Sequence, residues 1–131
     1  MSALHVERTG QGPALWLVHG WAMHGGVFAP LVRALEADFE VITVDLPGHG
    51  GSRDSALPLS MDDVADALAA LIDASAPARA LVVGWSLGGL VATALAARHP
   101  DRVRGLAMLA ASPRFVQAPD WPAGMDPRGF E

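Results

Sequence analysis

Along the chain, short continuous apolar runs alternate with longer segments in which apolar residues recur every three or four positions. The continuous runs predict buried β-strands, and the helical spacing predicts amphipathic helices. Strands are predicted over 4–8, 14–18, 40–44, 80–83 and 103–110. Helices are predicted over 28–35, 61–72 and 87–95. This alternation predicts an α/β fold with a mainly parallel sheet that carries helices on both faces.

Polar residues mark the ends of these helices. Ser60 is a predicted N-cap with Asp63 as its capping-box partner. Pro30 is tolerated because it falls in the first turn of its helix. Arg98 and His99 close the third helix, where positive charge interacts favourably with the negative end of the helix dipole.

Beyond residue 112 the periodicity is lost, and four prolines with two glycines predict an irregular segment. At 131 residues the chain is long enough for one domain and too short for two. We therefore divide it into a core over 1–112 and an irregular segment over 113–131.

The composition mainly excludes certain classes of binding site. The net charge is −5 and the charges are scattered, which argues against a nucleic-acid-binding patch or a polybasic membrane patch. Cysteine is absent, so disulfides and thiolate metal sites are excluded, and nothing implies a metal or an organic cofactor. The apolar run over 14–18 is too short for a signal segment or a membrane span, so we expect a cytoplasmic protein.

The strongest chemical signal is Gly84-x-Ser86-x-Gly88 between a predicted strand and a predicted helix. A serine at the tip of such a sharp turn has a strained backbone, and small residues on both sides let the chain pack tightly. This pattern is typical of a nucleophile elbow. The backbone N–H of Leu87, at the positive end of the helix, is placed to be one oxyanion donor.

Two further motifs follow the earlier strands. His19-Gly20-Trp21 comes after the strand over 14–18, where this fold class supplies the second oxyanion N–H, here that of Trp21. The alternative is that this segment only makes a turn at the end of the strand. The third motif, Asp45-x-Pro47-Gly48-x-Gly50-x-Ser52, is interpreted as structural, with the Asp45 carboxylate capping loop N–H groups.

These three motifs, in this order and separation, resemble the α/β-hydrolase superfamily. A closer similarity is to the biotin-pathway carboxylesterases, which demethylate pimeloyl-[acyl-carrier protein] methyl ester. It rests mainly on Trp85 and on the Trp121-Pro122 segment. The resemblance covers nearly the whole chain but only about the first half of such an enzyme.

The resemblance implies roles for individual residues. Ser86 is the expected nucleophile, the backbone N–H groups of Trp21 and Leu87 are the expected oxyanion donors, and Trp21 and Trp85 are the expected substrate-binding residues. The segment over 113–131 would begin the lid. The expected partner is a small acyl ester, either free or carried on an acyl carrier protein.

The catalytic triad is where the chain departs from the family, whose order is Ser, then Asp, then His on later strands. After Ser86 the only histidine is His99, which helix geometry puts about 20 Å away. The remaining histidines are candidates for a substitute base, the first two ahead of the others: His19, His24, His5 and His49. A serine without a base is a weak nucleophile, so we expect the triad Asp and His to be absent and this chain alone to be nearly inactive.

Two other expectations follow. The strand over 103–110 would form an exposed sheet edge, which favours self-association. The incomplete triad also leaves a second hypothesis open, a non-catalytic hydrolase-like scaffold that serves binding or assembly. A coincidental motif in an unrelated α/β domain is disfavoured by three ordered motifs.

Overall fold

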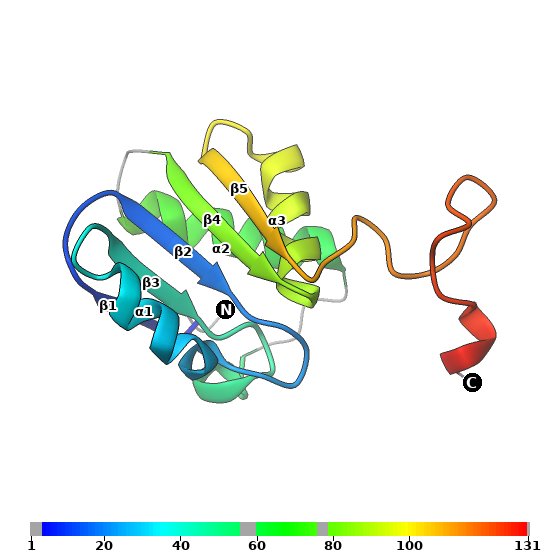
Figure 1. Cartoon of the computed structure of the whole chain (residues 1–131), viewed down its shortest axis with the longest axis horizontal. Helices are drawn as coiled ribbons and strands as arrows, with labels where there is room; N and C mark the ends of the chain where they lie inside the picture. Colours follow the sequence, from blue (N-terminus) through cyan, green and yellow to red (C-terminus); the bar gives the residue numbers. More distant parts are fainter. Residues whose placement is uncertain (1–3, 56–59, 76–78, 131) are drawn as a thin grey trace.

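The computed structural model describes residues 4–55, 60–75 and 79–130. Its strands form one sheet in the order β1-β3-β2-β4-β5. The strands are β1 (Val6–Thr9), β2 (Ala14–Val18), β3 (Glu40–Val44), β4 (Ala80–Trp85) and β5 (Val103–Leu109). β1 runs antiparallel to β3, and the other neighbouring pairs are parallel. The predicted mainly parallel sheet is therefore confirmed (Figure 1).

Helices connect the parallel strands. They are α1 (Ala29–Leu35), α2 (Met61–Ser75) and α3 (Leu87–Arg98), and short 3₁₀ turns cover Gly25–Phe28, Gly50–Ser52 and Pro127–Phe130. Pro30 lies in the first turn of α1, as expected. The Ser60 hydroxyl accepts the Asp63 N–H at 3.1 Å and donates to the Asp63 carboxylate at 2.7 Å, which confirms the predicted cap.

Four predicted strand boundaries shift. β1 spans Val6–Thr9 instead of 4–8, although Leu4 is itself buried in the core. β4 continues past Val83 to Trp85, because Trp85 pairs with Leu109 of the neighbouring strand. β5 stops at Leu109, one residue early.

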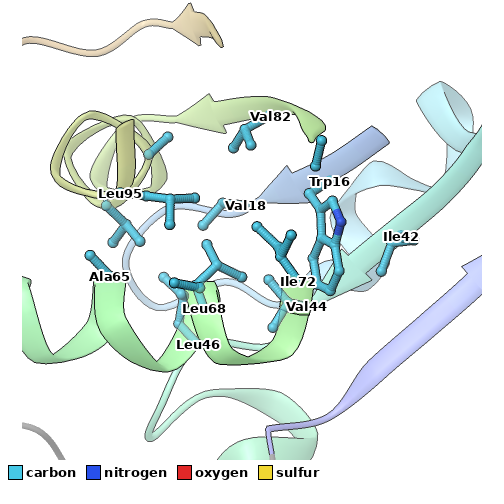
Figure 2. Packing of buried hydrophobic residues seen from close by; sticks show 14 of the residues in the cluster. Trp16, Val18, Ile42, Val44, Leu46, Ala65, Leu68, Ile72, Val82 and Leu95 are labelled. Carbon is cyan, nitrogen blue, oxygen red and sulfur yellow. The ribbon is translucent and has the colours of Figure 1, made fainter. Parts of the chain in front are cut away.

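The two faces of the sheet are packed differently, and β2 shows how. Alternate side chains of a strand point to opposite faces. Trp16 and Val18 join the larger core beneath α2 and α3, which Figure 2 shows from close by. Leu15 and Leu17 join a smaller cluster with residues of α1. Each face of the sheet is therefore covered by helix, as the sequence predicts.

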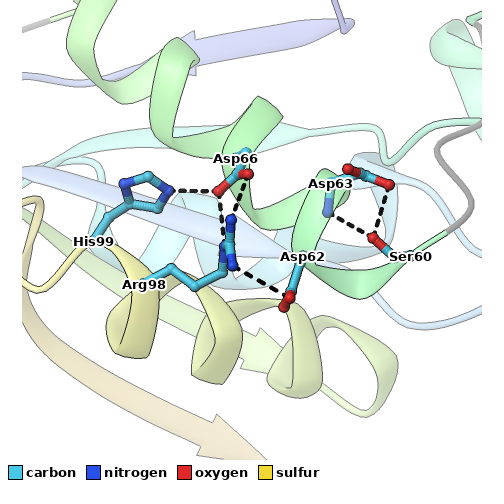
Figure 3. Close-up of polar contacts among 6 residues, drawn as sticks. All are labelled: Ser60, Asp62, Asp63, Asp66, Arg98 and His99. Atoms are coloured by element: carbon cyan, nitrogen blue, oxygen red, sulfur yellow. Dashed lines mark hydrogen bonds and ion pairs between the residues drawn. The ribbon is translucent and has the colours of Figure 1, made fainter.

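A polar network joins α2 to α3 at the surface (Figure 3). Arg98 donates two hydrogen bonds to the Asp66 carboxylate at 2.9 and 2.8 Å, and His99 Nε2 lies 2.7 Å from the same carboxylate. Arg98 also reaches Asp62 at 3.2 Å. Arg98 lies in the last turn of α3 and His99 at its C-cap, as the sequence predicts, and their side chains also bind Asp66 of the neighbouring helix.

The segment after β5 is irregular, as predicted, and Figure 1 shows it extending away from the sheet. It is held by its own hydrogen bonds rather than by the core. The Trp121 indole N–H donates to the Arg114 carbonyl at 3.0 Å, and isolated bridges pair Val116 with Met125 and Ala118 with Trp121.

Two features that would change the functional interpretation are a membrane-spanning helix and a metal site. No helix among them has both the length and the apolar character needed to cross a membrane. Among the same residues, no group of three or more His, Asp or Glu side chains is placed to hold a metal ion.

The core beneath α2 yields a first prediction. Leu68 is fully buried there, whereas Leu71 is only half-buried. Leu68→Ala should lower the free energy of unfolding by about 2–5 kcal/mol, because it leaves a cavity in a packed interior. Urea denaturation of both variants measures this. An equal or larger loss in Leu71→Ala would contradict the packing described.

The network around Asp66 yields a second prediction. Hydrogen bonds from Arg98 and His99 hold the pKa of the Asp66 carboxyl well below its usual range. A depressed carboxyl pKa stabilises the fold above the unfolded-state value, about 3.9, and the benefit is lost as the pH falls toward the folded-state value. Asp66→Asn should therefore lower the melting temperature by a few degrees at pH 7.

Asp62→Asn is the matched control, since Asp62 accepts only one longer bond from Arg98. Its melting temperature should change less than that of Asp66→Asn. The difference between the unaltered chain and Asp66→Asn should shrink when the pH is lowered below about 4. A difference that grows with acidity would show that the network does not act as described.

Candidate active site

Ser86 stands alone between the last residue of β4 and the first residue of α3, with φ 53° and ψ −116°. A positive φ in a non-glycine residue costs on the order of 1–3 kcal/mol and persists only where the surroundings enforce it. Here the Ser86 N–H donates to the Leu109 carbonyl at 2.9 Å, and the Ser86 carbonyl accepts the Gly89 N–H at 2.8 Å. The strained backbone is thus held from both sides.

Glycines around this turn allow its close packing. A Cβ on Gly84 would overlap the Gly88 carbonyl, and a Cβ on Gly88 would overlap the Val18 carbonyl. A Cβ on Gly89 would collide with Ala111. The steric reason that the sequence suggested for the Gly-x-Ser-x-Gly spacing is therefore confirmed.

The hydroxyl of Ser86 is not used to cap the helix that follows it. Serine at an N-cap position commonly accepts a hydrogen bond from the second or third helical N–H. Ser86 occupies that position in α3 but makes no side-chain capping bond. Within the part of the chain that the structure describes, its hydroxyl has no hydrogen-bond partner, so it remains available for chemistry.

The turn after β2 lies directly against Ser86. A Cβ placed on Gly20 would be 3.4 Å from both the Ser86 Cβ and the Trp85 carbonyl, which is ordinary contact distance. Trp21, the next residue, has 77% of its side chain exposed, while Trp85 is half-buried beside the α1 cluster. The structure thus brings three predicted site residues, Trp21, Trp85 and Ser86, to one end of the sheet.

Two backbone N–H groups near the serine have no acceptor among the described residues. One belongs to Trp21. The other belongs to Leu87, the first residue of α3, where helix geometry leaves an N–H without a partner inside the helix. The positive end of the α3 dipole lies at the same place. This arrangement is suited to stabilising negative charge that develops on an oxygen beside Ser86.

Asp45 caps loop N–H groups, as the sequence predicts. Its carboxylate accepts the Gly25 N–H at 2.6 Å and the Gly51 N–H at 2.8 Å, which ties the loop after β2 to the loop after β3. Burial alone would raise the pKa of the Asp45 carboxyl. The two backbone hydrogen bonds, with His5 and His19 nearby, outweigh burial and hold that pKa below its usual range.

His19 is fully buried, and both of its ring nitrogens are engaged. Nδ1 lies 2.7 Å from the Gly20 carbonyl, and Nε2 accepts the Leu46 N–H at 3.0 Å. Burial lowers the pKa of His19, although its hydrogen bond to the Gly20 carbonyl opposes that shift. The geometry therefore disfavours His19 as a substitute base and favours a structural role.

The other histidines also have partners away from the serine. His24 accepts the Gly26 N–H at 3.1 Å, and His5 lies 3.3 Å from the Glu7 carboxylate. His99 lies at the far end of α3, as helix geometry predicted. None of the five histidines in the sequence forms a hydrogen bond with Ser86 within the described residues.

His49 makes a contact that the sequence does not predict. Its Nε2 accepts the Ala22 N–H at 3.1 Å, so it contacts the turn that carries Trp21. The signal in the sequence was its place inside the Pro/Gly loop after β3. Its position in this loop does not indicate the hydrogen-bond partner of His49, because that partner, Ala22, lies 27 residues earlier in the chain.

The proteins to which this chain is similar are hydrolases and esterases, which is consistent with the geometry at Ser86. The family described as the alpha/beta hydrolase fold matches residues 13–128. The chain is 55% identical over 128 residues to a pimeloyl-[acyl-carrier protein] methyl ester esterase from Stenotrophomonas maltophilia, covering 98% of this chain and 47% of the relative. A protein of the same name from Xanthomonas campestris pv. campestris is 52% identical over 127 residues, covering 97% of this chain and 48% of the relative.

The fold of the chain is also similar to that of a solved structure. The enol-lactonase from Burkholderia xenovorans superimposes with a TM-score of 0.79 at 33% identity, covering 85% of this chain and 44% of that one. The chain spans about half the length of the curated relatives it matches. The family match covers most of the chain, and the mainly parallel sheet has the architecture of that family. The chain therefore belongs to the α/β-hydrolase family.

Proposed function

We propose that this chain carries the nucleophile and oxyanion hole of a serine carboxylic-ester hydrolase that acts through an acyl-enzyme. The observation that carries the proposal is the geometry of Ser86. Its backbone is held at φ 53°, its hydroxyl makes no capping bond, and the turn bearing Trp21 lies against it. Strain that is held at one serine beside available N–H groups supports a nucleophilic role.

In the proposed reaction, the Ser86 oxygen attacks the ester carbonyl carbon and its proton passes to a general base. The tetrahedral oxyanion is stabilised by the backbone N–H groups of Trp21 and Leu87. The bond from carbon to the alcohol oxygen then breaks, and the alcohol leaves with the proton. Water attacks the acyl-enzyme in the same way, releasing the carboxylic acid and restoring the serine.

The general base is the missing part of this scheme. None of the five histidines hydrogen-bonds Ser86 within the described residues. The relatives are about twice as long as the matched region. We propose that the base and its carboxylate partner come from the part of the enzyme that this chain does not span, and that residues 113–131 begin the lid after a core over 1–112.

The substrate class is proposed from the relatives. Proteins 52–55% identical to this chain are named pimeloyl-[acyl-carrier protein] methyl ester esterases. We propose the same substrate here, a methyl ester of an acyl chain on a carrier protein, in a cytoplasmic enzyme of biotin synthesis. The exposed indole of Trp21 and the half-buried Trp85 would contact the acyl chain beside the serine.

One observation supports a second candidate, a non-catalytic scaffold. Ser86 has no base among the described histidines, and a serine without a base is a poor nucleophile. In this case the hydrolase fold would serve binding, and Ser86 would be a relic. The two candidates differ in whether adding the remaining half of a relative produces turnover that depends on Ser86.

A fusion provides that test. Residues 1–131 are joined to the remaining part of the Stenotrophomonas maltophilia relative, and hydrolysis of p-nitrophenyl butyrate is measured. We expect the chain alone to stay near background and the fusion to turn over ester. Ser86→Ala in the fusion should lower kcat at least about 1,000-fold.

Ser60→Ala is the matched control, because the Ser60 hydroxyl caps α2 through Asp63 and makes no hydrogen bond to the turn among the described residues, so turnover should be unchanged. Fluorophosphonate labelling should be lost in Ser86→Ala and retained in Ser60→Ala. Turnover that persists in Ser86→Ala would refute the assignment of Ser86. A folded fusion without turnover would favour the scaffold.

We also propose that the chain self-associates through β5. This strand is at one edge of the sheet, and it exposes 39% of Leu106 and 44% of Leu109. An exposed edge with apolar side chains is a template for pairing. Size-exclusion chromatography at micromolar concentration should show species larger than a monomer, and Leu106→Lys should shift the chain toward the monomer. A clean monomer before substitution would contradict this proposal.

A further inference from the structure

The turn that carries Trp21 is held at both of the peptide groups that flank this residue. The carbonyl of the preceding peptide group, that of Gly20, lies 2.7 Å from His19 Nδ1. The N–H of the following peptide group, that of Ala22, donates to His49 Nε2 at 3.1 Å. Each peptide group is planar, so these contacts on both sides of Trp21 restrain its backbone dihedrals.

The hydrogen-bond partners also define the protonation of His49. Its Nδ1 lies 3.0 Å from the Pro47 carbonyl, which can only accept, and its Nε2 faces the Ala22 N–H, which can only donate. These contacts assign the ring proton of His49 to Nδ1 and leave Nε2 as the acceptor. The same reasoning applies to His19, whose ring centroid lies 5.0 Å from that of His49.

The hydrogen bond from the Ala22 N–H to His49 stabilises a backbone conformation that alanine seldom adopts. Ala22 has φ 63°, in the left-handed region that favours glycine. The Met23 N–H donates to the Gly20 carbonyl at 3.2 Å, so Ala22 occupies the third position of a tight turn, where a positive φ is otherwise met by glycine or asparagine. An external acceptor for the Ala22 N–H stabilises this conformation.

We propose that His49 is a positioning residue for the oxyanion hole, acting through Ala22 on the N–H of Trp21. The inference rests on the proposed function of Ser86. In a trans peptide the N–H points opposite to the carbonyl. Because His19 engages the Gly20 carbonyl, the N–H of Trp21 is directed away from His19, and Gly20 itself lies against Ser86.

His49 is suited to this role because its own loop is anchored. Asp45, at the start of that loop, binds the N–H groups of Gly25 and Gly51, and the Ser52 hydroxyl donates to the Asp45 carbonyl at 2.7 Å. The loop after β3 therefore acts as a fixed support for the more exposed turn after β2. His49 extends that support to the residue next to Trp21.

The first test uses nuclear magnetic resonance on the chain itself. Imidazole ¹⁵N shifts should show His49 neutral with the proton on Nδ1. His49→Phe keeps a ring but removes the acceptor, and it should shift the amide resonances of Ala22 and Trp21. His49→Gln offers an acceptor at similar reach and should restore them in large part. His24→Phe, at the residue that follows the turn, is the matched control and should leave both amides nearly unchanged.

The second test measures ester hydrolysis in the fusion described above. His49→Phe should lower kcat about tenfold with KM changed less than twofold, because the misdirected donor acts on the transition state rather than on substrate binding. His49→Gln should recover most of the loss, and such rescue separates positioning from a general loss of stability.

Two results would overturn the inference: a proton on Nε2 of His49, or His49→Phe with unchanged Ala22 and Trp21 amides and unchanged kcat. A fusion in which even the unaltered sequence gives no turnover would count against the proposed function of Ser86. The amide and imidazole signals of the chain would then still decide whether His49 holds the turn.

Discussion

The close approach of β4, α3 and β2 around Ser86 is the constraint on which the rest of the site depends. The turn from strand to helix is possible because positions 84 and 88, where a Cβ would overlap neighbouring backbone, are glycines, and it places Ser86 at a positive φ. Such strain persists only in a well-packed surrounding. The core beneath α2 and α3 supplies that packing, and the turn releases the serine hydroxyl from its usual capping role.

A second layer of polar contacts arranges the loops that face the serine. Asp45 joins the loops after β2 and β3 through backbone N–H groups, and His19 and His49 extend the connection to the peptide groups around Trp21. These side chains bind backbone rather than one another. The ends of two loops are thereby held together beside Ser86, and electrostatic stabilisation of a transition state requires such preorganised groups.

Much of this could be predicted from the sequence where the signal is local. The bounds of β2 and β3, the Ser60 cap and the steric need for glycine around Ser86 follow from apolar runs and short motifs. The longer β4, the pairing of Arg98 with Asp66 and the contact of His49 with Ala22 depend on segments distant in sequence. Periodicity contains no information about such partners, so those features required the fold.

We propose that the backbone N–H groups of Trp21 and Leu87 form an oxyanion hole beside the nucleophile Ser86. The most direct measurement is a crystal structure of the fusion after reaction with a fluorophosphonate. We expect a phosphonate on the Ser86 oxygen, with one phosphonyl oxygen about 2.7–3.1 Å from the backbone nitrogens of both Trp21 and Leu87. An adduct on another residue, or a phosphonyl oxygen turned away from both nitrogens, would contradict it.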